Sequence, residues 1–205
     1  MRGLIGKKIG MTRVFSSSGQ SVPVTVLEVG PCYVTQVKTV KNDGYDAIQL
    51  GFLELKEKHS TKPLTGHFKK NNVPPSKVLA EFQSVPKFNY KPGQRFNVSL
   101  FNEGDLVSVS GKSKGRGFSG TIKKYSFSTQ RKTHGQGDTH RHVGSIGAAS
   151  DPSRVFPGKK MPGRYGNKTV CVKDLEVISV NEEKNQLLVK GSVPGATNGI
   201  VYITR

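Results

Sequence analysis

Tryptophan is absent from this 205-residue sequence, and cysteine occurs only twice, at Cys32 and Cys171. Two cysteines are too few for a disulfide-stabilised scaffold, and they lack the paired spacing of a structural zinc site. We therefore expect an intracellular protein with reduced thiols. Neither cysteine lies in a motif that would make it a nucleophile, so no catalytic residue is predicted.

Long apolar runs are also missing. The longest stretches without a charged residue, 14–27 and 191–204, have 14 residues each and contain Ser, Gly, Thr and Pro. A membrane-spanning helix needs about 20 predominantly apolar residues. Lys7, Lys8 and Arg13 also interrupt the N-terminal stretch, where a secretory signal needs an unbroken apolar run. These absences predict a soluble protein that does not enter a membrane.

Acidic residues are scarce. The chain has 14 Asp and Glu against 32 Lys and Arg, a formal net charge of +18, and only 34% hydrophobic residues. An average globular domain has roughly 45–50% apolar residues, so the composition argues against a large closed-core enzyme and against an acidic cytosolic carrier. An excess of positive charge repels itself unless counter-charge is supplied. The expected partner is therefore a polyanion.

The positive charge is concentrated in the middle of the chain. Residues 110–170 contain 13 Lys and Arg, two acids and 11 of the 24 glycines, which leaves a net charge of +11 there. Apolar residues are too few to offset a backbone entropy of about 1–2 kcal/mol per ordered residue. Such a segment is either disordered or folds against a partner. Phe118, Tyr125 and Phe156 interleave with the basic residues, which favours folding against nucleic acid.

The sequence on either side of this segment predicts a mainly β protein. Short β-branched runs, separated by Gly and Pro turn signals, occur at 22–29, 33–40, 45–52, 96–101, 106–110, 169–172, 175–180, 187–189 and 200–203. Strands at this spacing are typical of a barrel or a sandwich. Residues 56–94 are rich in Lys and Pro, and we expect a small irregular insertion there.

Two glycine-rich motifs resemble nucleotide-binding loops but lack the required context. Residues 115–120 (GRGFSG) match G-x-G-x-x-G, yet no good helix follows them and no βαβ unit surrounds them. Gly111-Lys112-Ser113 resembles the end of a phosphate-binding loop, but Leu106 stands where that loop needs a glycine. We expect no cofactor, and we interpret the glycines as positions where one backbone approaches another closely.

Three histidines raise the question of a metal site. His134, His140 and His142 lie within nine residues, with Asp138 between them, and neutral imidazoles bind zinc and other transition metals. Arginine and lysine residues in the same run repel a dication. We therefore predict that these histidines contact RNA and that the chain has no metal site.

The predicted RNA-binding residues are the basic and imidazole side chains of the central segment. Lys and Arg would neutralise phosphates, and Arg could also form bidentate contacts or stack on bases. The set is Lys112, Lys114, Arg116, Lys123, Lys124, Arg131, Lys132, His134, His140, Arg141, His142, Arg154, Lys159, Lys160, Arg164 and Lys168. For the N-terminal cluster of Lys7, Lys8 and Arg13, a solvated strand edge and a phosphate contact are both open.

Several motifs in combination resemble the bacterial-type ribosomal protein L3 family, and the match runs from end to end. They are GLIGKKIGMTRVF, PVTVLEVGPC, NDGYDAIQLGF, KPLTGHFKK, SGKSKGRGFSGTIKKYSF, HGQGDTHRHVGSIG, RVFPGKKMPGRYGN and LLVKGSVPGATNG. The SKGRGFSG block followed by GSIG and GKKMPG is specific, unlike the isolated glycine pattern.

The resemblance implies a fold and a division of the chain. The fold would be a six-stranded translation-protein-type barrel with a small irregular α+β insertion and a long basic extended loop. Carried onto this sequence, the barrel core would be discontinuous, over 1–55, 95–116 and 168–205. The insertion would be 56–94, and the glycine-rich extension into RNA would be 117–167.

The resemblance also implies a function. Family members are structural constituents of the large ribosomal subunit in the cytoplasm and are not enzymes. They bind the large-subunit (23S-type) rRNA near its 3′ end, nucleate subunit assembly and extend toward the peptidyl-transferase region. The implied partners are this rRNA and the large-subunit proteins numbered fourteen and nineteen, with no small-molecule substrate.

Two departures from the family pattern stand in the central segment. Ala148 occupies the position of a glutamine that is methylated in some bacterial relatives, so this modification is not expected here. Lys124 and Tyr125 stand where many relatives have an arginine and a bulkier aromatic residue.

Two other classes of function remain open on sequence alone. An RNA-modifying enzyme or translation factor with the same kind of barrel would show turnover or nucleotide binding. A general nucleoid-type binder would have equal affinity for duplex DNA and ribosomal RNA.

Overall fold

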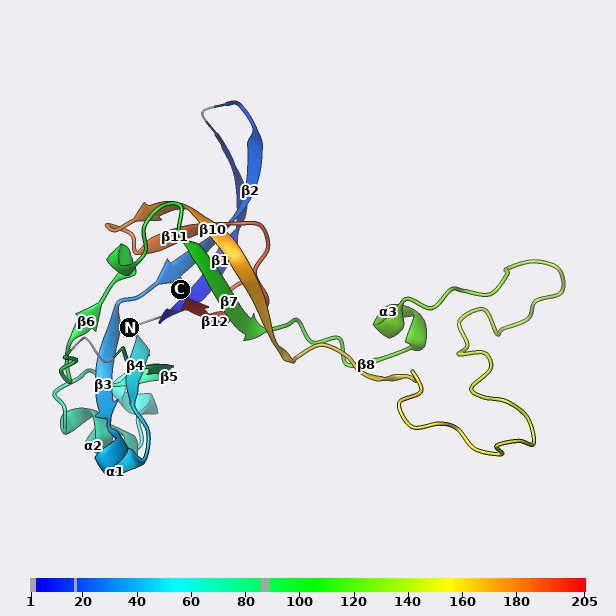
Figure 1. Ribbon diagram of the computed structural model, residues 1–205, viewed down its shortest axis with the longest axis horizontal. Coiled ribbons are helices and arrows are strands. Elements are labelled where there is room, and N and C mark those ends of the chain that lie inside the picture. The colour runs from blue at the N-terminus through cyan, green and yellow to red at the C-terminus, as the bar shows by residue number, and fades with distance from the viewer. Residues whose placement is uncertain (1–2, 17, 86–88) are drawn as a thin grey trace. The chain divides into compact units, whose positions relative to one another are not determined.

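The computed structural model describes residues 3–16, 18–85 and 89–205 (Figure 1). The chain forms two compact units. The first unit comprises Met1–Ser113 together with Thr169–Arg205, and the second unit is Lys114–Lys168. Strands predominate and the helices are few and short. The prediction of a mainly β protein is therefore confirmed.

Six strands of the first unit form a closed sheet. Every neighbouring pair is antiparallel, and the order is β1-β12-β7-β10-β11-β2, with β2 pairing again with β1. Because successive side chains point to opposite faces of a strand, Val107, Val109, Val201 and Ile203 all point inward and are buried. The strands are β1 (Gly3–Phe15), β2 (Ser21–Val29), β7 (Leu106–Lys112), β10 (Thr169–Asn181), β11 (Gln186–Lys190) and β12 (Ile200–Thr204).

Four further strands form a second sheet in the order β5-β4-β3-β6. Leu4 and Leu27 of the closed sheet and Ile48 and Leu50 of the second sheet belong to one hydrophobic cluster, so the two sheets share a core. The strands are β3 (Cys32–Lys38), β4 (Ala47–Glu54), β5 (Ser76–Gln83) and β6 (Arg95–Phe96).

The second sheet combines strands from both sides of residue 55. β3 and β4 pair with each other, and β4 pairs with β5, which lies inside the expected insertion. The strand predicted over 96–101 is wrong beyond Phe96, because Val98–Leu100 form a 3-10 helix, η2. Alternating hydrophobicity indicates which face of a strand is buried, but it does not identify the neighbouring strand. The partner of each strand was therefore not readable from the sequence.

Short helices connect the strands of the second sheet. α1 (Val40–Asp43) joins β3 to β4, and η1 (Glu57–His59) and α2 (Lys62–Lys69) lie between β4 and β5. Phe68 of α2 is buried. In the described ranges, no helix has the length and apolar character that crossing a membrane requires.

The closed sheet also sets where the second unit starts and ends in the chain. Lys112, the last residue of β7, lies opposite Thr169, the first residue of β10, and Gly111 lies opposite Val170. β7 pairs in addition with β12, and β10 pairs with β11. The strand ends that precede and follow the second unit are therefore held side by side.

Candidate nucleic-acid interface

A short antiparallel ladder joins the two ends of the second unit. β8 (Phe118–Ser119) pairs with β9 (Gly163–Arg164). The Arg116 N–H donates to the Tyr165 carbonyl at 2.8 Å, and the Tyr165 N–H donates to the Gly117 carbonyl at 3.0 Å. Residues 116–119 and 163–165 together form this base ladder.

Glycine permits a close approach beside the base ladder. Gly166 has φ 74°, a left-handed conformation that side chains rarely adopt. A Cβ at this position would overlap the Lys114 carbonyl oxygen. Gly166 therefore has to be glycine for the backbone to lie this close to Lys114. The close approach predicted for the glycines of residues 115–120 is not found at Gly117 or Gly120, where a Cβ would meet nothing within 4 Å.

The second unit has no buried apolar core. Among residues 114–168, all of which the structure describes, only Ser119 and Thr121 are buried. Phe118 is 79% exposed and Phe156 is 56% exposed. Little apolar burial is available to offset the entropy of ordering this unit. Most of its side chains are therefore exposed to solvent.

The predicted RNA-binding residues lie on the surface. Lys112 is at the end of β7 in the first unit, and the other fifteen are in the second unit. Lys124 and His140 are half-buried. The exposed ones are Lys112, Lys114, Arg116, Lys123, Arg131, Lys132, His134, Arg141, His142, Arg154, Lys159, Lys160, Arg164 and Lys168.

The second unit cannot neutralise its own charge. It contains 12 Lys and Arg, and its only acids are Asp138 and Asp151. A low-acid surface with this many cations produces a positive field that attracts polyanions. The excess positive charge of the second unit is thus exposed to solvent.

Cations and aromatic rings meet on this surface. The Tyr125 ring, at the end of α3 (Thr121–Tyr125), has the Lys124 Nζ at 5.0 Å and the Lys160 Nζ at 5.8 Å from its centroid. The Arg154 guanidinium lies 5.1 Å from the centroid of the Phe156 ring. Positive charge and a planar face side by side can contact a phosphate and stack on a base.

The contact between Lys160 and Tyr125 was missed by the sequence reasoning. Lys124 is next to Tyr125 in the chain. Lys160 is distant in sequence: Tyr125 follows β8, Lys160 precedes β9, and the pairing of β8 with β9 brings the two residues together. No local sequence signal reports a contact between residues so far apart.

The histidines occupy a turn-rich loop. The His140 Nδ1 donates a hydrogen bond to the Arg131 carbonyl at 3.0 Å, and the Gln130 N–H donates to the His140 carbonyl at 3.1 Å. His134 and His142 are exposed. In the described part of the chain, no group of three or more His, Cys, Asp or Glu is arranged to hold a metal ion.

The two cysteines are free thiols, of which Cys32 is buried and Cys171 is exposed. Burial raises the pKa of the Cys32 thiol to about 12, so this thiol is protonated at neutral pH. It donates to the Ile5 carbonyl at 3.5 Å. Cys32 is therefore a core residue without the thiolate character of a nucleophile.

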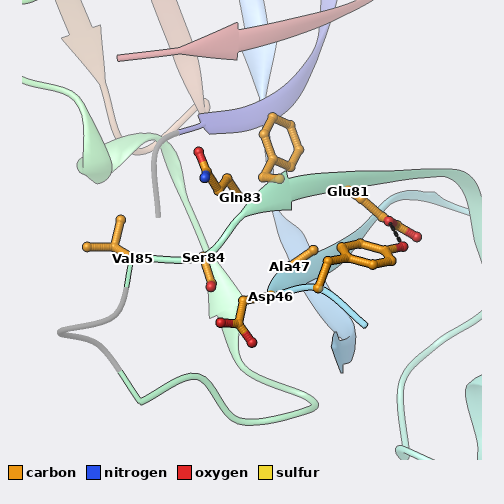
Figure 2. Close-up of a pocket in the computed structure, with 8 residues that line it drawn as sticks. Asp46, Ala47, Glu81, Gln83, Ser84 and Val85 are labelled. Carbon is orange, nitrogen blue, oxygen red and sulfur yellow. Dashed lines mark hydrogen bonds between the residues drawn. The ribbon is translucent and has the colours of Figure 1, made fainter. Parts of the chain in front are cut away.

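A pocket of about 640 Å³ lies at the second sheet, between residues 45–47 and 81–85 (Figure 2). The Glu81 carboxylate accepts a hydrogen bond from the Tyr45 hydroxyl at 2.8 Å and pairs with the Lys38 Nζ at 2.7 Å. These two partners hold the pKa of Glu81 below its ordinary value. Asp46 accepts a hydrogen bond from the Val40 N–H at 3.0 Å. Both carboxylates are thus engaged in structural contacts rather than poised for acid–base chemistry.

Comparison with known proteins identifies similar chains over almost the whole sequence. The family model described as ribosomal protein L3 matches residues 88–187. The large ribosomal subunit protein uL3 of Petrotoga mobilis is 49% identical over 203 residues, which cover 99% of this chain and 94% of the relative. The proteins of the same name from Thermotoga petrophila and Thermotoga maritima are 51% identical over 203 residues, covering 99% of this chain and 96% of each relative.

Proposed function

Because the chain belongs to the ribosomal protein L3 family, we propose that it binds the large-subunit ribosomal RNA through its second unit. The relatives are named as proteins of the large ribosomal subunit. This chain is likewise a structural constituent of that subunit, located in the cytoplasmic ribosome, and is not an enzyme.

The observation that carries the RNA-binding proposal is the exposed, unneutralised charge of the second unit. Twelve cations and two acids occur in a unit without a buried apolar residue. RNA phosphates supply the missing counter-charge, and unstacked bases supply flat surfaces for Tyr125 and Phe156. The second unit would thus acquire its final order when it binds RNA.

The proposed contacts divide by side-chain chemistry. Lysines and arginines neutralise phosphates, arginines also make bidentate contacts, and histidines hydrogen-bond to or stack on the RNA. Such contacts position RNA more than they read its sequence. The residues are the sixteen predicted from the sequence, from Lys112 to Lys168.

The closed sheet is the anchor in this proposal. It is a barrel of the translation-protein type, and it holds Lys112 and Thr169 opposite each other so that both ends of the RNA-binding segment enter at one place. The division proposed for the chain is a discontinuous core, an insertion over 56–94 and an RNA-binding extension over 117–167.

Within the subunit, the chain is a primary binder near the 3′ end of the 23S-type rRNA. It nucleates assembly and extends toward the peptidyl-transferase region, with the proteins numbered fourteen and nineteen as neighbours. A 3′-terminal fragment of this rRNA should therefore bind the purified protein more tightly than a 5′-terminal fragment of equal length. Equal affinity for both fragments and for duplex DNA would indicate a general nucleic-acid binder.

Salt dependence tests the charge mechanism. Six to ten phosphate contacts should reduce the affinity for an rRNA fragment about 10³–10⁵-fold between about 50 and 200 mM salt. Replacing Lys159 and Lys160 by Gln should make the slope of log affinity against log salt shallower by roughly 0.7–0.9 for each phosphate that is no longer neutralised.

The matched control changes the same charge on the first unit. Lys77→Gln combined with Lys184→Gln removes two exposed lysines outside the second unit and should leave the slope unchanged. A flat salt profile for the unaltered protein, or equal slopes for the two double variants, would contradict the mechanism.

A further inference from the structure

The outer end of the β1–β2 hairpin stands apart from the rest of the closed sheet. β12 pairs with β1 only over Gly3–Lys7, and β11 pairs with β2 only over Val24–Glu28. Beyond these points, in the part of the chain that the structure describes, 9–15 pairs with β2 alone. The two strands reach past the other strands of the sheet (Figure 1). Residues 9–15 and 21–22 form this distal hairpin. Residues 10–12 lie opposite β2 residues that also pair with β11, so the hairpin is two-stranded only over 13–15 and 21–23.

One face of the distal hairpin exposes large side chains. Met11, Arg13 and Phe15 lie at alternate positions of β1 and therefore share a face. Met11 is 53% exposed and Phe15 is 64% exposed. The Arg13 guanidinium lies 5.9 Å from the centroid of the Phe15 ring. On the opposite face Val14 and Val22 lie across from each other and are half-buried.

An exposed two-stranded ribbon of this kind is poorly supported in water. An isolated hairpin is marginally stable at best, and an open strand edge with apolar side chains invites pairing with another chain. The Met11–Arg13–Phe15 face therefore carries the features of a surface that is covered in the assembled state.

Charge distinguishes a protein partner from RNA at this face. Residues 9–22 contain one charged residue, Arg13, whereas the second unit contains 12 cations. A surface with one cation gains little from phosphate neutralisation. Met, aromatic residues and Arg are enriched at protein–protein interfaces, where Lys is depleted. The composition of the face thus matches a protein interface.

We propose that the Met11–Arg13–Phe15 face docks a neighbouring protein of the large subunit, one that offers an apolar patch beside a carboxylate. The patch would cover Met11 and Phe15, and the carboxylate would pair with Arg13. This docking site rests on the proposed function, because the partner is reached only in the assembled subunit.

Photo-crosslinking in purified large subunits tests the docking site. A photoreactive amino acid at Met11 or at Phe15 should crosslink to one ribosomal protein, at a peptide that contains Asp or Glu. The matched control is Thr12, which is exposed on the opposite face of the same strand and should give about tenfold less product. Crosslinks to rRNA, crosslinks to a second copy of this chain, or equal yields from Thr12 would overturn the proposal.

A truncation series provides a second readout. Met11→Ala with Phe15→Ala should lower the yield of the same protein crosslink, measured from position 13, about tenfold, as truncation of a buried interface anchor does. Leu106→Ala, at another residue that is 60% exposed, should leave it unchanged. An unchanged yield in the double variant would contradict the docking site.

The two proposals fail in different ways. A chain that does not co-sediment with large subunits, or whose affinity for rRNA is insensitive to salt, contradicts the proposed function. A chain that assembles normally but crosslinks to RNA from Met11 contradicts only the docking site.

Discussion

The lysines and arginine near the N-terminus have three different environments, although the sequence groups them in one cluster. Lys7 pairs with Glu28 at 3.8 Å on the surface of the closed sheet. Lys8 is only 8% exposed, and its Nζ donates to the Val193 carbonyl at 2.8 Å. Arg13 lies beside the Phe15 ring. The three side chains have the same charge, so only their different contacts distinguish the surface ion pair, the buried lysine and the exposed arginine.

The buried Lys8 is expected to stabilise the loop that precedes β12. Its substitution by Ala removes hydrogen bonds to the Val193 and Gly195 carbonyls and should lower the free energy of unfolding by about 1–3 kcal/mol. Urea denaturation of the whole protein measures this decrease. Lys7→Ala, at the partly exposed ion pair with Glu28, should cost less than about 1 kcal/mol. Equal decreases in the free energy of unfolding would show that the buried contacts of Lys8 contribute no more to stability than the ion pair of Lys7.

The Glu81 carboxylate should make stability depend on pH. Its hydrogen bonds to Lys38 and Tyr45 lower its folded-state pKa below the ordinary value of 4.5. The unfolded chain therefore takes up the proton first, and the contribution to stability is present above about pH 4.5 and is lost as pH falls through the folded-state pKa. Because the pair is partly exposed, the contribution should not exceed about 1 kcal/mol.

Thermal melting between neutral and acidic pH measures this effect. Glu81→Gln should be less stable than the unaltered protein at neutral pH, and the difference should shrink below pH 4.5. Glu182→Gln, at an exposed residue of the turn between β10 and β11, is the control with no expected change. If Glu81→Gln remains less stable than the unaltered protein by the same amount at low pH, the ionised Glu81 carboxylate is not the source of the difference.

Among the structural elements, the base ladder organises the second unit. It joins residues more than 40 positions apart with two short strands and two further backbone hydrogen bonds. Through this pairing, Lys160 reaches the ring of Tyr125. The ladder depends on glycine, because Gly166 lies against the Lys114 backbone with a positive φ.

Gly166→Ala should therefore disrupt the base ladder. The added methyl group overlaps the Lys114 carbonyl oxygen and disfavours the left-handed backbone. We expect faster hydrogen exchange of the Arg116 and Tyr165 amides and at least about a tenfold loss of rRNA affinity, or 1.4 kcal/mol. Gly120→Ala is the control, since a Cβ there meets nothing within 4 Å. Unchanged exchange in Gly166→Ala would mean that the ladder tolerates the methyl group.

In the molecule as a whole, the hydrophobic core and the concentrated positive charge lie in different units. The first unit contains every buried hydrophobic residue of the described chain, and the second unit contains 12 exposed or half-exposed cations. Stability and the proposed RNA contacts are therefore carried by different parts of the sequence. This separation explains how a chain with a net charge of +18 still builds a core.

Limited proteolysis should reveal this division. In the free protein, trypsin should cut first within residues 114–168, because this unit offers exposed lysines and arginines on backbone without a packed core. In assembled large subunits the same sites should be protected by RNA. Mass spectrometry of the fragments identifies the cuts. Equal protection of the free and assembled protein would indicate that the second unit is stably folded by itself.

The sequence by itself determined the mainly β class, the family and the location of the charge excess at 110–170. These properties follow from composition and from local pattern, which are independent of how distant segments meet. The structure adds that Phe118 and Phe156, which have few apolar residues near them in the sequence, are both exposed.

Only the tertiary structure decided which strands close the sheet, that β3 and β4 pair in a second sheet, and that Lys8 is buried while Arg13 is exposed. It also decided that Lys160 reaches Tyr125. Each of these features depends on contacts between residues far apart in the chain. Hydrophobic alternation and charge counts describe single segments, so they hold no information about which segments become neighbours.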